Sequence, residues 1–534
     1  MLIDDFLARS AERYPDKVAV VGDGKSLTYG EMEAQVNRLA RLLREVGVGP
    51  GERVAVFLPN RVEAAVAIFA ILRAGGAFVV LNPSTKARGL AFMLSDCGAR
   101  AIVAGGRDRT LREALATHPA GLSAAVICGH DPAEEEPLLT PTLSRGERGR
   151  ISVPVYSYER DCARFSATPP EHRAIDADLA AIVYTSGSTG RSKGVAFAHF
   201  NVVSAARSIT QYLGNVPEDV VLNVLPLSFT YGLHQLIASV YCGGTLVLLQ
   251  SYVYPYEVVR AVMDYRVTGI PGVPTFFAIL LQMKDLEPGC FDSVRYVTNA
   301  GAALPPAHFA RLRQLFRKAR IFSMYGVTEC VRVSYLPPEE LEARPASVGK
   351  GMPNQELDIV DERGRPVGPG EVGELIVRGN HVMRGYWNLP EETERSLRPG
   401  RYPWERWLYT GDLFRRDEEG YLYFVARKDD IIKSRGEKVS PREVENVICE
   451  LPDVLEVAVV GAPDPILGQV VKAIVVKLPD SPLSKLDVVN HCARLLENYK
   501  VPKIVEFRDG LPKTMSGKVR KVELREETAP REPL

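Results

Sequence analysis

The sequence lacks several features that mark large classes of protein. Its eight cysteines are widely spaced and include no Cys-x-x-Cys pair, which argues against a zinc site and against a disulfide framework. This cysteine usage is typical of the reducing cytoplasm, where we expect the protein to work. Lys plus Arg equals Asp plus Glu at 66 each, so no net charge attracts the chain to nucleic acid or to an anionic membrane.

The sequence also lacks a long apolar run and a basic leader. The longest uncharged apolar run, residues 236–249, is shorter than the ~20 residues that a helix needs to cross a bilayer, and it contains Gly243 and Gly244. The first five residues include two acids where a signal peptide has basic residues. We therefore expect a soluble protein with no membrane span and no nucleic-acid partner.

The chain is long and has an ordinary globular composition. Its 534 residues are too many for a single hydrophobic core, so we expect two or three domains. With 46% hydrophobic and 25% charged residues, it resembles an average soluble protein. Residues 131–150 are the exception, because dense charge, Pro and Gly without apolar periodicity predict a solvated loop there.

Short apolar runs alternate with helical patterns in two successive series. This alternation predicts an α/β fold with two doubly wound, mainly parallel sheets up to about residue 345. In such sheets, ligands bind at the carboxyl ends of the strands. The expected strands lie at 53–58, 77–81 and 99–104 in the first series, and at 220–226, 245–249, 267–273, 294–298 and 319–324 in the second.

The pattern changes in the last third of the chain. Short strands and Gly/Pro turns, with a clear hairpin at 415–423, predict a small β-barrel-like subdomain over 346–426. A compact α+β module follows. Its expected elements are helices at 441–450 and 484–497 and strands at 454–460 and 470–476.

Residues 185–194 (TSGSTGRSKG) form the most informative segment of the chain. They follow the strand-like run 179–184 and precede a helical stretch that starts near Phe200. Glycines let the backbone N–H groups approach a phosphate, and the hydroxyls and the lysine complement its oxygens. The spacing differs from the P-loop pattern, in which the lysine follows a glycine directly. The expected nucleotide-binding residues here are Thr185, Ser186, Gly187, Ser188, Thr189, Gly190 and Lys193.

Six segments in the same order resemble the adenylate-forming (ANL) superfamily, which includes the AMP-dependent acyl-CoA synthetases. Besides the loop, they are 325–329 (YGVTE), 373–379 (GELIVRG), 409–412 (YTGD), 427–433 (RKDDIIK) with Gly436, and 512–518 (PKTMSGK). The resemblance implies a large N-terminal domain over 1–426, a hinge at 427–430 centred on Asp429, and a mobile C-terminal domain over 431–534. It implies that a carboxylic acid reacts with ATP to give an acyl-adenylate, and that the acyl group then passes to a thiol.

The resemblance also assigns roles around the nucleotide. Glu329 would hold Mg²⁺, which binds through one or two carboxylates together with phosphate oxygens. Thr328 would contact the α-phosphate, and Tyr325 would stack near the adenine. An ionised carboxylate suits the two ribose hydroxyls, which is the role implied for Asp412. Arg427 would contact ribose or phosphate, or would only anchor the hinge.

Two further positions complete the implied reaction centre. Gly301 belongs to the turn 299–302, which would lie against the adenine. Lys518, on a turn near the C-terminus, would bridge the substrate carboxylate and the phosphate during adenylation; a lysine is a flexible point charge suited to that reach. In the second half-reaction the small domain would rotate and bring the Gly436 region into the site in place of Lys518.

The sequence leaves alternatives for the thiol that accepts the acyl group and for the acid that is activated. Coenzyme A is the acceptor that the resemblance implies. The alternatives are an acyl-carrier protein loaded in trans and a nucleotide-binding scaffold without turnover. The segment 325–338 is most similar to ligases encoded beside exosortase systems, which is a finer match on a short stretch.

The implied acid-binding pocket contains no acidic residue. Where amino-acid-activating relatives carry an aspartate, this chain has Thr230, which offers no charge for an ammonium group. We therefore expect uncharged, apolar acids, either medium-to-long fatty acids or aryl acids, to be better substrates than amino acids. The implied lining consists of Phe229, Thr230, His234, Ala300 and Ala302.

Overall fold

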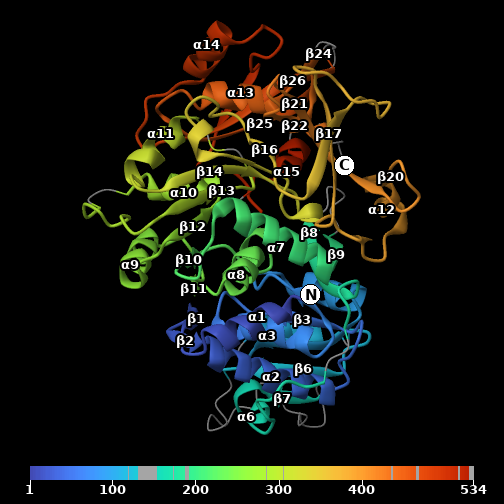
Figure 1. The fold of residues 1–534 in the computed structure, drawn as a ribbon. Coiled ribbons are helices and arrows are strands. Elements are labelled where there is room, and N and C mark those ends of the chain that lie inside the picture. The colour runs from blue at the N-terminus through green and yellow to red at the C-terminus, as the bar shows by residue number, and fades with distance from the viewer. Residues whose placement is uncertain are drawn as a thin grey trace, which may run out of the picture.

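The computed structural model is shown in Figure 1. It describes residues 1–106, 108–117, 119–129, 153–171, 174–186, 192–283, 286–302, 304, 306–434, 437–464, 468–514 and 518–527. The segment 131–150, for which we predicted a solvated loop, lies outside these residues. None of the described helices is long and apolar enough to cross a bilayer.

The first sheet is built from the first series of predicted strands. Its strand order is β19-β9-β8-β4-β3-β5-β6-β7, and the pairs from β8 to β7 are parallel. The strands are nearly continuous apolar runs, as expected where helices cover both faces. Their bounds are β3 (Arg53–Phe57), β4 (Ala77–Val80), β5 (Ala99–Gly105), β6 (Ala124–Cys128), β7 (Val155–Ser157), β8 (Leu179–Ser186), β9 (Ser192–Ala198) and β19 (Gly385–Tyr386).

The second sheet contains the second series together with the first two strands of the chain. Its order is β16-β15-β14-β13-β12-β10-β11-β1-β2, parallel from β1 to β14 and antiparallel at both edges. The bounds are β1 (Val18–Gly22), β2 (Lys25–Thr28), β10 (Val220–Asn223), β11 (Thr245–Leu248), β12 (Gly269–Gly272), β13 (Tyr296–Asn299), β14 (Arg320–Tyr325), β15 (Ser334–Leu336) and β16 (Lys350–Gly351).

Helix α3 (Val62–Arg73) shows how the core of the large domain is organised. All its residues are buried, including Glu63 and Arg73. A helix that is apolar all round is packed on every side. Its two charged residues are paired: Arg73 binds Asp4 at 2.9 Å, and Glu63 binds Arg61 at 2.7 Å. In Figure 1, helices α7 (His199–Leu213) and α8 (Thr230–Cys242) lie between the N-terminal strands and the rest of the molecule.

A third, antiparallel sheet follows and leads to the hinge. The pairing runs β17-β18-β21-β20, with β22 on β21. The predicted hairpin at 415–423 is confirmed, since Arg416 pairs with Leu422 and Asp412 with Arg427. The strands are β17 (Gln355–Val360), β18 (Gly373–Gly379), β20 (Leu397–Pro399), β21 (Arg406–Arg416) and β22 (Leu422–Arg427).

The C-terminal residues form a separate α+β layer, orange to red in Figure 1. Its sheet has the order β24-β23-β26-β25, with β27 on β26, and two apolar clusters pack on it. Both predicted helices and both predicted strands are confirmed. The elements are β23 (Ile432–Ser434), β24 (Glu437–Val439), α13 (Pro441–Ile448), β25 (Val454–Asp464), β26 (Gly468–Lys477), α14 (Lys485–Leu495), β27 (Ile504–Phe507) and α15 (Lys521–Glu526).

The predicted fold class, an α/β chain with a large N-terminal domain and a small α+β C-terminal domain, is confirmed. Short 3₁₀ turns are η1 (Thr328–Cys330), η2 (Pro338–Glu340) and η3 (Lys428–Asp430). The remaining helices are α1 (Asp4–Arg13), α2 (Tyr29–Glu45), α4 (Ala87–Asp96), α5 (Arg109–Leu115), α6 (Tyr158–Cys162), α9 (Pro255–Tyr265), α10 (Pro274–Leu280), α11 (Pro306–Leu315) and α12 (Pro390–Ser396).

Candidate active site

The glycine-rich loop joins the two antiparallel strands β8 and β9 of one hairpin. Thr185 pairs with Lys193 and Ser186 with Ser192 across the ladder. Strand β9 was not predicted, because its first three residues belong to the segment 185–194, for which we expected a loop, and the next expected element was the helix near Phe200. The hairpin fixes both ends of the loop. The other predicted phosphate ligands lie outside the described residues: Gly187, Ser188, Thr189 and Gly190.

Lys193 contacts two residues that the sequence did not indicate, and one of them, Tyr386, connects it to Glu329. Its ammonium lies 2.7 Å from Oε2 of Glu392 and 5.5 Å from the centroid of the Tyr386 ring. The Tyr386 hydroxyl donates a hydrogen bond of 2.7 Å to Oε1 of Glu329. The hydrogen bond from Lys193 holds the pKa of Glu392 below its usual value. Glu392 lies 199 positions from Lys193, so no local pattern reveals the pair.

Tyr325 and the two residues predicted beside it occupy the end of β14 and the following 3₁₀ turn η1. The Tyr325 hydroxyl donates a 2.5 Å hydrogen bond to Oδ2 of Asp412. Its ring meets Phe414 edge-on at 4.8 Å between centroids. Thr328 begins η1 and Glu329 follows it, both half-buried. The YGVTE motif therefore meets the YTGD motif directly, through one side-chain hydrogen bond.

Asp412 is a buried carboxylate with one oxygen left free for a ligand. It is 3% exposed, and its Oδ1 lies 3.0 Å from Nη1 of Arg427 but has no hydrogen-bond donor in the described part of the chain. Burial raises the pKa of Asp412, and the Arg427 charge and the Tyr325 hydroxyl oppose that rise. A buried acceptor without a donor is unusual in a protein interior. Hydroxyl groups, such as those of a ribose, are suitable donors for it.

Lys518 lies beside this cluster although it belongs to the C-terminal layer. A Cβ built on Gly301 would lie 3.9 Å from Cε of Lys518. The residue keeps access to solvent, yet the surrounding protein atoms lower the pKa of its ammonium, while Asp412 and Glu329 attract its charge. Lys518 thus stands among residues of three predicted motifs.

The predicted acid-binding residues lie on two neighbouring elements. Phe229 and Thr230 are half-buried at the start of α8, and His234 is 3% exposed on the same helix. Ala300, at the end of β13, is buried, whereas Ala302 in the following turn is exposed.

His234 is held neutral by its surroundings. Burial lowers its pKa to about 4, and the nearby charge of Arg332 adds to that shift. Its Nδ1 lies 2.9 Å from the Thr230 carbonyl oxygen, so Nδ1 carries the proton. Its Nε2 is buried with no partner in the described residues.

The predicted hinge is attached to both parts of the molecule. Lys428 binds Glu374 of the third sheet at 3.1 Å, while Asp430 pairs with Arg525 of α15. Asp429, between them, is exposed. Gly436, the predicted contact for the thiol step, lies outside the described residues.

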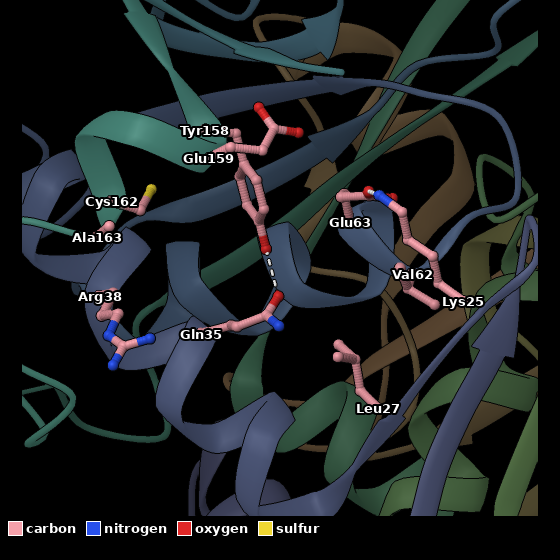
Figure 2. Close-up of a pocket in the computed structure, with 10 residues that line it drawn as sticks. All are labelled: Lys25, Leu27, Gln35, Arg38, Val62, Glu63, Tyr158, Glu159, Cys162 and Ala163. Carbon is pink, nitrogen blue, oxygen red and sulfur yellow. Dashed lines mark hydrogen bonds and ion pairs between the residues drawn. The ribbon is translucent and has the colours of Figure 1, made fainter. Parts of the chain in front are cut away.

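A cavity of about 280 Å³ lies apart from these residues, among β2, α2, α3 and α6 (Figure 2). The Tyr158 hydroxyl donates a 2.8 Å hydrogen bond to the side chain of Gln35 within it, and Glu63 binds Lys25 at 2.6 Å. No predicted site residue lines it, so we assign it neither the nucleotide nor the acid. Its lining is Lys25, Leu27, Gln35, Arg38, Val62, Glu63, Tyr158, Glu159, Cys162 and Ala163.

This chain is similar to known proteins of one family. The chain matches the family model "AMP-binding enzyme" over residues 7–387 and its C-terminal domain over 443–518. It is 32% identical to a long-chain-fatty-acid–CoA ligase of Escherichia coli O157:H7, over 98% of this chain and 94% of that protein.

Two solved structures show the same similarity. The anthranilate CoA ligase AuaEII in complex with anthranoyl-AMP gives a TM-score of 0.88 at 26% identity, covering 99% of this chain and 97% of the other. ATP-bound MatB from Rhodopseudomonas palustris gives 0.85 at 28% identity, covering 99% of each chain.

Proposed function

The chain belongs to the AMP-binding enzymes, and from this premise we propose how its residues activate a carboxylic acid. The protein is an AMP-forming acyl-CoA ligase: the acid reacts with ATP to give an acyl-adenylate and pyrophosphate, and the acyl group then passes to coenzyme A. One observation carries the residue-level proposal. Lys518 lies beside Gly301 and within electrostatic reach of both Asp412 and Glu329.

Asp412 binds the ribose in this proposal. Its Oδ1, which accepts no hydrogen bond from the described residues, accepts one from a ribose hydroxyl, and the hydrogen bond from Tyr325 to Oδ2 fixes the carboxylate plane. Arg427 neutralises the carboxylate through its ion pair with the same Oδ1. With its hydroxyl engaged, Tyr325 is oriented to present the face of its ring to the adenine.

Lys193, Thr185 and Ser186 bind the phosphates together with the loop 187–190, and Thr328 binds the α-phosphate. Glu329 is suited to Mg²⁺, because among the described residues its carboxylate accepts a side-chain hydrogen bond only from the neutral Tyr386 hydroxyl, and Mg²⁺ needs one or two carboxylates with phosphate oxygens. When bound there, Mg²⁺ would neutralise charge on the triphosphate.

Lys518 brings the two anions together. Its ammonium bridges the attacking carboxylate and the α-phosphate, whose mutual repulsion opposes the reaction. The C-terminal layer is therefore oriented, relative to the large domain, in the way that the proposed adenylation step requires. Rotation about Asp429 then brings the Gly436 region to the site for the thioester step, a conformational gate between two half-reactions.

The acid is proposed to bind between the start of α8 and the turn after β13, against Phe229, Thr230, His234, Ala300 and Ala302. Burial of an acyl chain there contributes ~0.8 kcal/mol per CH₂. A cytoplasmic location and the finer resemblance to exosortase-associated ligases remain predictions. So does an acyl-carrier protein as the alternative acceptor.

Two assays test the function. Acid-dependent exchange of labelled pyrophosphate into ATP measures adenylation, and thioester formation with coenzyme A measures transfer. A scaffold without turnover gives neither signal. Exchange without coenzyme A thioester, but with loading of a phosphopantetheinylated carrier protein, would replace coenzyme A by the carrier as acceptor.

A further inference from the structure

Arg332 is a buried guanidinium that lacks a carboxylate partner in the described part of the chain. It is 3% exposed and follows Glu329, the proposed Mg²⁺ ligand, by three positions. Its guanidinium carbon lies 4.8 Å from the centroid of the Tyr231 ring, and its Nε has no hydrogen-bond acceptor among the described residues. A cation–π contact offsets part of the desolvation of a buried cation. A full counter-charge is still missing, and unpaired buried charges are strongly unfavourable.

The backbone before Arg332 is strained in a way that fixes the direction of this side chain. Val331 has φ 64° and ψ −60°, and the Arg332 N–H donates to the Cys330 carbonyl oxygen at 2.6 Å. This is the rare γ-turn with positive φ, which a β-branched residue adopts only under constraint. Gly326 makes room for the turn, since a Cβ there would lie 2.6 Å from the Val331 carbonyl oxygen. Strain of this kind is concentrated at ligand sites.

The contacts of Tyr231 place Arg332 near the reaction centre. The Tyr231 hydroxyl lies 2.6 Å from Oγ1 of Thr298 and 3.0 Å from its carbonyl oxygen. Thr298 immediately precedes the turn 299–302, next to which Lys518 lies. One aromatic ring therefore separates the Arg332 guanidinium from the end of the strand that leads into this turn.

The α8 face opposite Arg332 does not supply the missing negative charge. Tyr231 and His234 are three positions apart and so share one face of the helix. His234 is neutral at pH 7, as its lowered pKa of about 4 requires. The Tyr212 hydroxyl, whose pKa is raised by burial against the opposing charge of Arg332, is neutral as well. Arg332 is thus a positive charge among polar but uncharged neighbours.

We infer that Arg332 binds a second carboxylate of the substrate, so that this enzyme activates a dicarboxylic acid. An apolar spacer would connect the reacting carboxyl group, near Lys518, to the carboxylate held by Arg332. The inference rests on the proposed function and refines its substrate. It replaces the expectation of an entirely uncharged tail, because Arg332 was absent from the lining predicted from the sequence. It retains the exclusion of amino acids, since Arg332 repels an ammonium group.

Matched pairs of acids test this inference on the full-length protein. Linear dicarboxylic acids of three to ten carbons and the monocarboxylic acids of equal length are compared by pyrophosphate release, with isophthalate against benzoate as the aromatic pair. The wild-type kcat/KM is expected to be at least tenfold higher for the best diacid than for its matched monoacid. The kcat/KM for glutarate should exceed that for glutamate by more than tenfold.

Substitutions then assign the preference to Arg332. Arg332→Met is expected to lower kcat/KM for the diacid at least thirtyfold. The kcat/KM for the matched monoacid should stay within threefold of the wild-type value. Arg332→Lys keeps the charge without the planar fork and should retain part of the preference. Arg320→Met is the matched control, because Arg320 also lies over an aromatic ring, at 5.2 Å from the Phe322 centroid, but its side chain, at the start of β14, is half exposed and pairs with Glu339.

The outcomes are distinguishable. The inference is overturned, and the ligase function left intact, by either of two results. One is a wild-type kcat/KM that is higher for a monoacid than for every diacid. The other is an equal loss of kcat/KM for both acids in Arg332→Met. Failure of every acid to release pyrophosphate would refute the proposed function itself. If Arg332→Met does not fold, as judged by its melting temperature, the wild-type panel and Arg332→Lys still decide the question.

Discussion

Two ionisable residues of the site, Asp412 and Lys518, stand in surroundings that disfavour their charged forms. Burial raises the pKa of the aspartate, and the surrounding protein atoms lower the pKa of the lysine although it keeps access to solvent. Each charge attracts the other, so the two together are less unfavourable than either alone. Perturbed groups with a specific partner are concentrated where a protein binds or reacts with a ligand.

At the residue scale, Lys518→Ala is expected to separate the half-reactions. Loss of a preorganised cation should lower the adenylation rate by ~10²- to 10³-fold. Thioester formation from a supplied acyl-adenylate should stay within threefold of wild type, because Lys518 serves only the first step. Lys513→Ala is the control, since Lys513 pairs with Glu456 within the C-terminal layer. Equal losses in both half-reactions would contradict the assignment.

The ion pair between Lys193 and Glu392 leads to a second prediction at this scale. Lys193 must leave Glu392, at least in part, to bind a phosphate, and a pair of this exposure is worth ~0.2–1 kcal/mol. Glu392→Gln is therefore expected to lower the KM for ATP about two- to fivefold. The neighbouring Glu391 is more exposed and pairs with Arg395 alone among the described residues, so Glu391→Gln should leave the KM for ATP unchanged. A raised KM in Glu392→Gln would show that Glu392 positions Lys193 for the nucleotide.

At the scale of elements, the 3₁₀ turn η3 connects two rigid layers. Lys428 binds the third sheet and Asp430 binds α15, so the ion pairs on either side of Asp429 stabilise the orientation seen here. Any rotation between the layers has to change the backbone near Asp429 and to break at least one of these pairs.

Asp429→Pro should therefore retain adenylation and lose transfer. Proline fixes φ near −65°, which suits the 3₁₀ turn and resists a change of conformation. Pyrophosphate exchange is expected to remain within threefold of wild type, while thioester formation falls at least tenfold. Asp429→Ala controls for the lost carboxylate. Overall ligation at the wild-type rate in Asp429→Pro would show that the rotation occurs elsewhere.

At the scale of the whole molecule, the buried carboxylate of Asp412 makes the stability of the fold depend on pH. The native state binds a proton at Asp412 more tightly than the unfolded chain does. The free energy of unfolding therefore falls as the pH rises from the unfolded pKa, ~3.9, through the raised folded pKa. At pH 7, ionised Asp412 lowers the stability of the protein.

Asp412→Asn is expected to keep or raise the melting temperature at pH 7, an advantage that disappears below about pH 4. ATP at a hundred times its Kd should stabilise the wild type by ~2.7 kcal/mol, and the variant should lose most of that gain. Thermal unfolding with and without ATP measures both effects. Asp264→Asn, which removes an exposed acid paired with Arg260, should change neither. A large drop in melting temperature for Asp412→Asn without ATP would contradict the raised pKa.

The sequence indicated the chemistry of the site because that chemistry depends on short segments. The glycines, hydroxyls and lysine of residues 185–194 suggested a nucleotide, and the family resemblance assigned Thr328, Glu329, Asp412 and Lys518 to it. The alternation of strands and helices predicted the two sheets. Periodicity did not predict strand β9, nor that β1 and β2 join the second sheet, because partner choice between strands is decided by packing rather than by local pattern.

The sequence by itself therefore determined the fold class and the reaction type, and it suggested most of the residues that we propose to bind the nucleotide. Only the tertiary structure placed Glu392 against Lys193, Tyr386 against Glu329 and Arg332 over Tyr231. It also placed Lys518 beside Gly301 and near Asp412 and Glu329, the orientation that the proposed adenylation requires. The physical reason is that burial and electrostatic pairing depend on distances in space, and residues separated by 57 or 199 positions share no local pattern that reports those distances.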